Sequence, residues 1–299
     1  MRLAILADIH GNIHALDAVL ADIETQSADR LVVNGDLVNR GPNNVAVVER
    51  VLSLGATVTL GNHDDLMRKW VERDDDIPEH WFGDPLWEGM AWSARQLADA
   101  NLIGPLRDLP LTHRINAEGA PTLLVSHGSP RHYREGYGRY LSDQDIAEII
   151  TQYPADVLVG SHTHQPMARR WGPHHVLNTG SVGTPFNGDP RAQYLLLTLE
   201  DEGWRPEFRS VPYDRDGALR AFETSGLLAD GQLGGRIFFE EARCARSFFT
   251  PFWMWTEEQS VPQNWDTWQQ FRDTFTERFR PARLSANENP EDADPQTEK

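Results

Sequence analysis

The chain of 299 residues contains a single cysteine, Cys244, so it cannot form an intrachain disulfide. This favours a reducing compartment, because disulfides persist mainly in oxidising ones. No stretch reaches the roughly 18 consecutive apolar residues of a membrane span. The chain also begins with a strand-like run where a secreted protein would have a basic and apolar leader. We therefore expect a cytoplasmic protein with no membrane partner.

Basic residues are also few, since 28 Lys and Arg stand against 45 Asp and Glu, giving a formal net charge of −17. Binding of duplex nucleic acid requires a basic face that displaces counterions, so this charge argues against such a partner. It does not exclude a small anionic substrate, because bound cations are the largest local charges in the sites that hold them. Hydrophobic residues make up 39% of the chain, enough for a sizeable core in one or two domains.

A repeated local pattern stands out in this ordinary composition. Five apolar runs, at residues 3–7, 31–33, 58–60, 122–125 and 157–159, lead into polar side chains. The side chains that follow these runs are Asp8, His10, Asp36, Asn62, His63, Asp64, His127, His162 and His164. Polar groups at the ends of buried runs need partners, and side chains two residues apart in an extended segment point the same way. A pair of metal ions is the partner that all of them could share.

The order of elements predicts a layered α/β fold. Residues 1–64 alternate between strand and helix patterns, which is typical of crossover units in a largely parallel sheet. Ligands of such sheets collect beyond the carboxyl ends of the strands, where Asp8, Asp36 and Asn62 fall. Residues 192–199 and 204–211 predict a late hairpin, and we expect a second sheet packed on the first.

Three further segments complete the expected organisation around a body of residues 1–213. Residues 65–111 contain four tryptophans and predict a helical insertion over the carboxyl edge of the sheet. Residues 214–284 form an aromatic-rich helical extension, in which Trp268 to Phe279 predict one amphipathic helix ended by Pro281. We expect the extension to dock on the body, with a homo-oligomer interface as the alternative. Residues 285–299 are acidic and almost free of hydrophobics, which predicts a disordered tail.

The order of the polar blocks resembles the calcineurin-like metallophosphoesterase superfamily. The blocks are Asp8-x-His10, Gly35-Asp36, Gly61-Asn62-His63-Asp64, His127 and Gly160-Ser161-His162-Thr163-His164. Residues 39–42, 126–130 and 178–183 are most similar to its small bacterial and archaeal phosphodiesterase branch. The resemblance covers about residues 1–200. It implies a four-layer sandwich of two mixed β-sheets flanked by α-helices, with two metal ions at the ends of the strands.

Carried over position by position, the resemblance implies two sets of metal ligands that share Asp36. Asp8, His10, Asp36 and His164 would hold one ion, and Asp36, Asn62, His127 and His162 the other. Imidazole, carboxylate and amide donors without thiolate suit Mn²⁺, Fe, Zn²⁺ or Ni²⁺, of which we favour Mn²⁺. A hydroxide between two such ions could attack phosphorus in line, since bound divalent ions lower the pKa of water.

Three more residues are candidates for roles in catalysis. His63 resembles the histidine of the family that faces the leaving group, and we expect it to donate a proton. Arg40 resembles the arginine of the family that contacts phosphate. We expect Asp64 to support the loop that carries Asn62 and His63. Asn39 stands where phosphoprotein phosphatases carry the aspartate that orients and charges the catalytic histidine. A neutral amide stabilises an imidazolium less than that carboxylate does, so position 39 favours diesters over phosphoprotein monoesters as substrates.

These observations predict a dinuclear metal-dependent phosphodiesterase that acts on small phosphodiesters or nucleotides, with 2′,3′-cyclic nucleotides as the favoured substrates. One alternative is a phosphomonoesterase, including phosphoprotein or dinucleoside polyphosphate hydrolysis. Another is a nuclease for single strands, for which only the tryptophans between residues 70 and 92 and scattered arginines could form a groove. An alternative of a different class is a non-catalytic protein-binding scaffold, because a retromer subunit uses this fold for protein binding.

Overall fold

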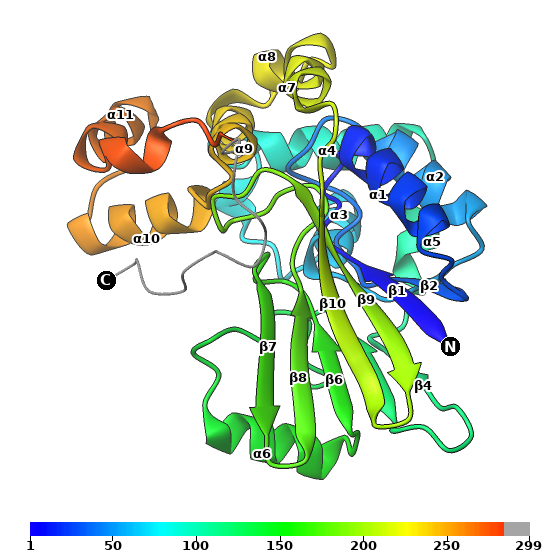
Figure 1. Cartoon of the computed structure of the whole chain (residues 1–299). Helices are drawn as coiled ribbons and strands as arrows, with labels where there is room; N and C mark the ends of the chain where they lie inside the picture. The colour runs from blue at the N-terminus through cyan, green and yellow to red at the C-terminus, as the bar shows by residue number, and fades with distance from the viewer. Residues whose placement is uncertain (284–299) are drawn as a thin grey trace.

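The computed structural model describes residues 1–283. Two five-stranded sheets pack face to face, with helices on both outer surfaces (Figure 1). Alternation along β1 (Arg2–Leu6) shows how the layers form, because neighbouring side chains of a strand point to opposite faces. Leu3 and Ile5 join the core between the sheets, whereas Ala4 and Leu6 join the core beneath the helices. The predicted four-layer α/β sandwich is confirmed.

The first sheet has the strand order β10-β9-β1-β2-β3. Its other strands are β2 (Arg30–Val33), β3 (Thr57–Val58), β9 (Ala192–Glu200) and β10 (Gly203–Val211). β1, β2 and β3 are parallel, as the crossover pattern predicts. The late hairpin exists, but the expectation that it contributes a second sheet was wrong: β9 pairs antiparallel with β1 and extends the first sheet. This pairing occupies the second edge of β1 and buries Leu195 and Leu197 between the sheets.

The second sheet has the order β4-β5-β6-β8-β7. Its strands are β4 (Thr112–Ile115), β5 (Leu123–Ser126), β6 (Val157–Gly160), β7 (Pro166–Trp171) and β8 (His174–Thr179). β5, β6 and β8 are parallel, and the two edge strands are antiparallel to them. The ends of β5 and β6 therefore open on the same edge of the sheet, as those of β1 and β2 do in the first sheet.

Helices cover the two outer faces. The helices of the body are α1 (Ile13–Thr25), α2 (Asn44–Ser53), α3 (Asn62–Glu72), α4 (Glu88–Asp99), α5 (Ile103–Arg107) and α6 (Asp143–Gln152), with the 3-10 turn η1 (Glu79–Trp81). α1 begins where expected, since the Asn12 side chain accepts from the Ala15 N–H. α6 begins at Ser142, which accepts from the Asp145 N–H, and packs on the outer face of the second sheet.

Residues 65–111 are helical, as predicted, and their tryptophans pack inward. Trp70, Trp87 and Trp92 are buried in the core that surrounds α4, and Trp81 stacks on Trp87 with ring centroids 3.4 Å apart. Within residues 1–283, no helix combines the length and the apolar character that a bilayer crossing requires.

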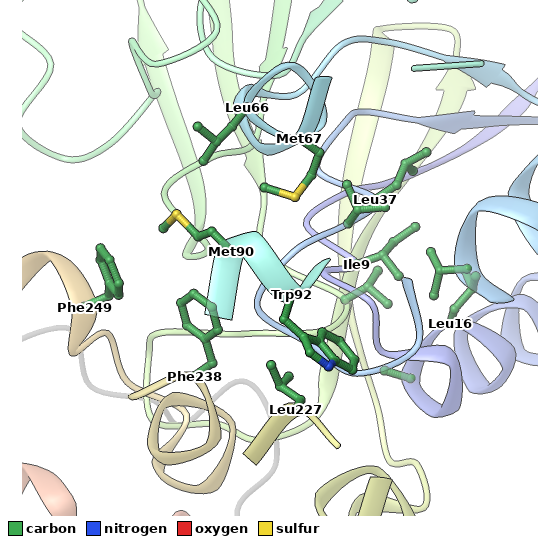
Figure 2. Close-up of a cluster of buried hydrophobic side chains, with 14 of the residues drawn as sticks. Ile9, Leu16, Leu37, Leu66, Met67, Met90, Trp92, Leu227, Phe238 and Phe249 are labelled. Atoms are coloured by element: carbon green, nitrogen blue, oxygen red, sulfur yellow. The ribbon is translucent and has the colours of Figure 1, made fainter. Parts of the chain in front are cut away.

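The carboxyl-terminal extension docks on the body through a shared core. Its helices are α7 (Arg215–Thr224), α8 (Leu227–Asp230), α9 (Gln232–Cys244), α10 (Phe249–Gln259) and α11 (Trp265–Thr274), followed by the 3-10 turn η2 (Thr276–Phe279). Figure 2 shows Leu227 and Phe238 of the extension beside Met90 and Trp92 of α4, and all four belong to one buried cluster. α4 and α9 approach closely at Gly89, where an added Cβ would lie 2.8 Å from the Gly235 nitrogen.

The prediction of one amphipathic helix from Trp268 to Phe279 was wrong. α11 ends at Thr274, and Phe275 leaves the helical conformation with φ −117° and ψ 38° before η2 begins. This change of direction lets Phe279 stack on Phe248 with centroids 4.1 Å apart. The expected disordered tail at residues 285–299 lies outside the described residues. The alternative oligomer interface stays a prediction.

Candidate metal centre

Four of the predicted ligands converge where strands of the two sheets end. Single donor atoms of Asp8, His10, Asp36 and His164 all lie within 4.8 Å of one another. His10 Nε2 is 3.3 Å from His164 Nε2 and 3.6 Å from Asp36 Oδ2, and His164 Nε2 is 3.4 Å from Asp8 Oδ1. The four side chains are buried and come from turns after β1, β2 and β6, so the parallel strands bring together residues that are 156 positions apart.

A second group shares Asp36 with the first. Donor atoms of Asp36, His127 and His162 lie within 4.8 Å of one another. Asn62 completes this group, because its Oδ1 is 2.8 Å from His162 Nδ1 and 3.1 Å from His127 Nε2. The two groups match the two predicted ligand sets in membership and in the residue that they share. That they bind metal stays a prediction.

Hydrogen bonds on the far side of three imidazole rings fix which nitrogen faces the centre. The Nδ1 atoms of His10, His127 and His164 lie 3.1, 2.8 and 2.5 Å from the carbonyl oxygens of Val38, Asn34 and Thr184. A carbonyl only accepts, so each Nδ1 carries a proton and, in the neutral form of the ring, the Nε2 lone pair is directed into the centre. Metal-binding histidines are oriented in this way in proteins. No pattern in the sequence indicates these carbonyl partners.

The backbone of the site is unusual. Seven of its non-glycine residues have left-handed backbone, with φ between 47° and 69°: Asp8, His10, Asp36, Asn39, Arg40, His162 and His164. Such conformations are uncommon outside glycine and cost on the order of 1–3 kcal/mol each. They turn successive side chains inward within very few residues. Strain of this kind concentrates at functional sites, where the surrounding structure maintains it.

Asp64 supports the turn that carries Asp36. Its carboxylate accepts from the N–H groups of Asp36, Leu37 and Gly61 at 2.8, 2.9 and 3.0 Å. Burial and the charge of Asp36 raise the pKa of Asp64 to about 7, whereas these N–H groups oppose the shift. Because all three partners are donors, the ionised carboxylate satisfies them best. Asp64 thus occupies the supporting position expected for it, away from the cavity of the site.

Burial sets the protonation of the centre. It lowers the pKa of His10 and His164 well below the usual value and that of His162 to about 4. These rings are neutral near pH 7, the form in which histidine binds a metal. Burial opposes the charge of Asp36, but the nearby imidazoles, His127 foremost, hold its pKa well below the ordinary range. Burial likewise opposes a charge on His127, yet the neighbouring carboxylates raise its pKa to about 10. Without a bound cation this ring therefore also carries a proton on Nε2, which a metal ion would replace.

The donor set fits a pair of divalent cations. Asp8 Oδ1 and Asp36 Oδ2 are buried and have no hydrogen-bond partner among residues 1–283. An unpaired buried carboxylate oxygen is costly, and it faces imidazole nitrogens that present further lone pairs. A bound cation would satisfy these acceptors together. Nitrogen and oxygen donors without thiolate are those expected for a metal such as Mn²⁺, Fe or Zn²⁺.

His63 lies beside the centre and is held by Asn39. Asn39 Nδ2 is 2.8 Å from His63 Nδ1, and Asn39 Oδ1 accepts from the Arg40 N–H at 2.8 Å. Because Oδ1 is engaged with that donor, the amide group must donate to His63 Nδ1. Neutral His63 therefore carries its proton on Nε2. Burial lowers the pKa of His63 well below its usual value.

Arg40 is held by a residue of the extension. Its Nη1 pairs with Glu241 Oε2, and both side chains are buried. The other carboxylate oxygen, Oε1, accepts from the N–H groups of Phe248 and Phe249 at 2.8 Å each. The guanidinium also lies 5.6 Å from the ring centroids of Phe186 and Phe238. No local pattern in the sequence indicates the role of Glu241, which lies 201 residues from Arg40.

A cavity of about 340 Å³ opens over the centre. Asp36, Arg40, His63, His162 and His164 line it, together with residues of the extension. Phe186, which no sequence pattern indicates, also lines the cavity, and its ring stacks on His164 with centroids 4.2 Å apart. No tryptophan of residues 65–111 lines this cavity, so the buried packing role accounts for those side chains. Asn178 forms the polar turn beneath, where its Nδ2 donates to the Ser161 carbonyl at 2.6 Å.

This fold and this centre are those of a metal-dependent phosphoesterase. Residues 1–166, more than half of the chain, match the family model of the calcineurin-like phosphoesterases, and the protein belongs to that family. The resemblance found in the sequence is confirmed.

Individual relatives agree with this assignment. An uncharacterised protein of Methanocaldococcus jannaschii is 26% identical over 251 residues, which cover 79% of this chain and 97% of that one. Phosphodiesterase YfcE of Escherichia coli is 27% identical over 197 residues, 66% of this chain and 87% of the enzyme. The crystal structure of a metallophosphoesterase from Sphaerobacter thermophilus superposes with a TM-score of 0.59 at 26% identity, covering 77% of this chain and 99% of that one.

Proposed function

We propose that this protein hydrolyses small phosphodiesters, cyclic nucleotides among them, with two divalent ions held by the two groups of side chains that share Asp36. The observation that carries the proposal is the pair of buried oxygens Asp8 Oδ1 and Asp36 Oδ2, which have no hydrogen-bond partner among residues 1–283 and face the imidazoles of His164 and His10 beside a cavity that Asp36 and His164 line. Bound there, the ions would supply a nucleophile from water and positive charge for the phosphoryl oxygens. The similarity to a phosphodiesterase of Escherichia coli supports the same reaction.

The chain's own residues would handle the leaving group. His63 lines the cavity and, because Asn39 occupies Nδ1, carries its proton on Nε2. This N–H would donate a hydrogen bond to the leaving oxygen of a diester and stabilise the negative charge that develops there. Arg40, held at the cavity by Glu241, would contact a phosphoryl oxygen. A neutral amide at position 39 supplies less support for an imidazolium than a carboxylate would, which favours diesters over monoesters.

The test compares two chromogenic substrates in the presence of Mn²⁺. We expect faster turnover of bis-p-nitrophenyl phosphate than of p-nitrophenyl phosphate, and a clear preference for the monoester would overturn the proposal of a phosphodiesterase. His63→Ala should retain its metal, measured by elemental analysis, and lose about 10²–10⁴-fold in kcat. His80→Ala, which removes an exposed histidine outside the site, is the matched control and should leave kcat unchanged. Unchanged turnover in His63→Ala would remove that residue from the reaction.

A further inference from the structure

The extension supplies one side of the cavity over the metal centre. Four of the lining residues, Arg246, Ser247, Thr250 and Arg278, come from the segment between α9 and α10, the first turn of α10, and η2. All four lie outside residues 1–166, which match the family model. In Figure 1, α9 and α10 lie on the side of the sheets at which β6 and β8 end. This part of the cavity therefore comes from residues beyond the segment that matches the family model.

Hydrogen bonds and a buried ion pair fix this side of the cavity to the body. Arg243 Nη2 donates to the Phe279 carbonyl at 2.8 Å, which ties η2 to α9 beside Arg278. The Gly188 N–H donates to the Ala245 carbonyl at 2.9 Å and ties the loop after Phe186 to the residue before Arg246. The buried pair of Arg40 and Glu241 joins the same region to the centre.

The cavity is locally basic in an acidic protein. Three arginines line it, at positions 40, 246 and 278, against one carboxylate, Asp36. Glu241 offsets the charge of Arg40. Among residues 1–283, no carboxylate forms an ion pair with Arg278, which is exposed. Thr250 is the second residue of α10, so the positive end of that helix dipole adds to the same field. A net charge of −17 for the whole chain makes the gathering of arginines at this cavity informative.

We infer that Arg246 and Arg278, with the hydroxyls of Ser247 and Thr250, bind a second phosphate group of the substrate, beside the phosphodiester that reacts. This inference rests on the proposed function. Guanidinium groups match phosphate because they offer paired N–H donors in one plane. A volume of about 340 Å³ lies at the small end of ligand pockets, so both phosphates belong to one small molecule. The substrate class is a nucleotide diester with a further phosphate, or a dinucleoside polyphosphate.

Matched substrates test this subsite in the full-length enzyme loaded with Mn²⁺. Adenosine 2′,3′-cyclic phosphate and its 5′-phosphorylated form share the same scissile bond, and only the second carries a further phosphate group. Diadenosine tetraphosphate supplies the further phosphate groups within a polyphosphate chain. Bis-p-nitrophenyl phosphate reports the basal reaction. We expect kcat/KM to be at least about tenfold higher for one of the phosphorylated substrates than for the unphosphorylated cyclic nucleotide, because charge-assisted contacts to phosphate are strong. That substrate identifies the source of the second phosphate.

The variants Arg278→Gln and Arg246→Gln should each remove most of this preference and leave turnover of bis-p-nitrophenyl phosphate within twofold of the natural enzyme. Arg280→Gln is the matched control, since Arg280 is exposed two residues further on and does not line the cavity. Equal rates on all the nucleotides, or equal losses on every substrate in Arg278→Gln, would overturn the subsite while the phosphodiesterase stands. Failure to turn over bis-p-nitrophenyl phosphate at all would instead overturn the proposed function. Because Arg278 is exposed, its variant also serves if Arg246→Gln fails to fold.

Discussion

Replacing Glu241 with alanine tests whether the extension is part of the metal centre's structure. The change removes the carboxylate that pairs with Arg40, whose side chain is only 8% exposed. It also removes the acceptor of the N–H groups of Phe248 and Phe249, at the start of α10. The guanidinium would remain buried between Phe186 and Phe238 with no opposite charge beside it.

The expected cost follows from these contacts. Breaking a buried ion pair by removing one partner costs about 3–5 kcal/mol, because the other charge stays desolvated. Each backbone N–H left without an acceptor adds about 1–3 kcal/mol, although these contributions are not additive. We expect Glu241→Ala to lower the free energy of unfolding by at least about 3–5 kcal/mol. Glu241→Gln should cost less, because its amide oxygen can still accept from both N–H groups.

The double variant Arg40→Met/Glu241→Leu separates the charge from the packing. It removes both charges together, so it should recover part of the loss seen in Glu241→Ala, since apolar replacements of a buried pair are often neutral. Glu258→Ala, in the exposed part of α10, should change stability by no more than about 0.5 kcal/mol.

Urea unfolding of metal-free protein at pH 7, followed by tryptophan fluorescence and circular dichroism, measures these differences. Coincident transitions with unchanged denaturant dependence would allow the free energies to be compared. A loss below about 1 kcal/mol in Glu241→Ala would refute the reasoning, because it would mean that Arg40 reaches solvent or another acceptor without cost.

Three further outcomes are expected. Asn39→Asp should place a negative charge beside His63 Nδ1 and raise the pKa of that ring. The basic limb of the pH profile of kcat/KM for bis-p-nitrophenyl phosphate should then move to higher pH by about one unit or more. A basic limb at the same pH as in the natural enzyme would contradict this prediction. Burial opposes ionisation of Asp22, but hydrogen bonds from Arg209 and Tyr194 lower its pKa below the ordinary value. The contribution of ionised Asp22 to the free energy of unfolding should therefore be complete above the ordinary pKa of aspartate and be lost as pH falls through the lower pKa of the folded state. In a series of urea unfolding midpoints measured from pH 5 to pH 2, Asp22→Asn should reduce the dependence of the midpoint on pH. Burial raises the pKa of Cys244 to about 11, so the native thiol should react with Ellman's reagent at pH 8 far more slowly than in urea, and equal rates would show that the site is open.

Local sequence was sufficient where the interaction itself is local. The strand periodicity of residues 3–7, the helix start at Asn12 and the cap at Ser142 are decided within a few residues, and the structure bears them out. The predicted helix through Phe275 failed because a long-range contact, the stacking of Phe279 on Phe248, competes with helical propensity. The late hairpin likewise joined the first sheet because the free edge of β1 was available to it.

By itself, the sequence determined the family, the layered α/β class and the membership of the candidate metal centre. Each of its side chains follows an apolar strand, and the carboxyl ends of parallel strands must meet at one edge of a sheet. Only the tertiary structure decided how the site is held and what surrounds it. The carbonyls behind the imidazoles, the amide of Asn39 on His63, the pairing of Glu241 with Arg40 and the place of Arg278 in the cavity lining depend on contacts between segments that are distant in the chain. Such contacts leave no periodicity in the chain, because their geometry exists only after the sheets and the extension have packed together.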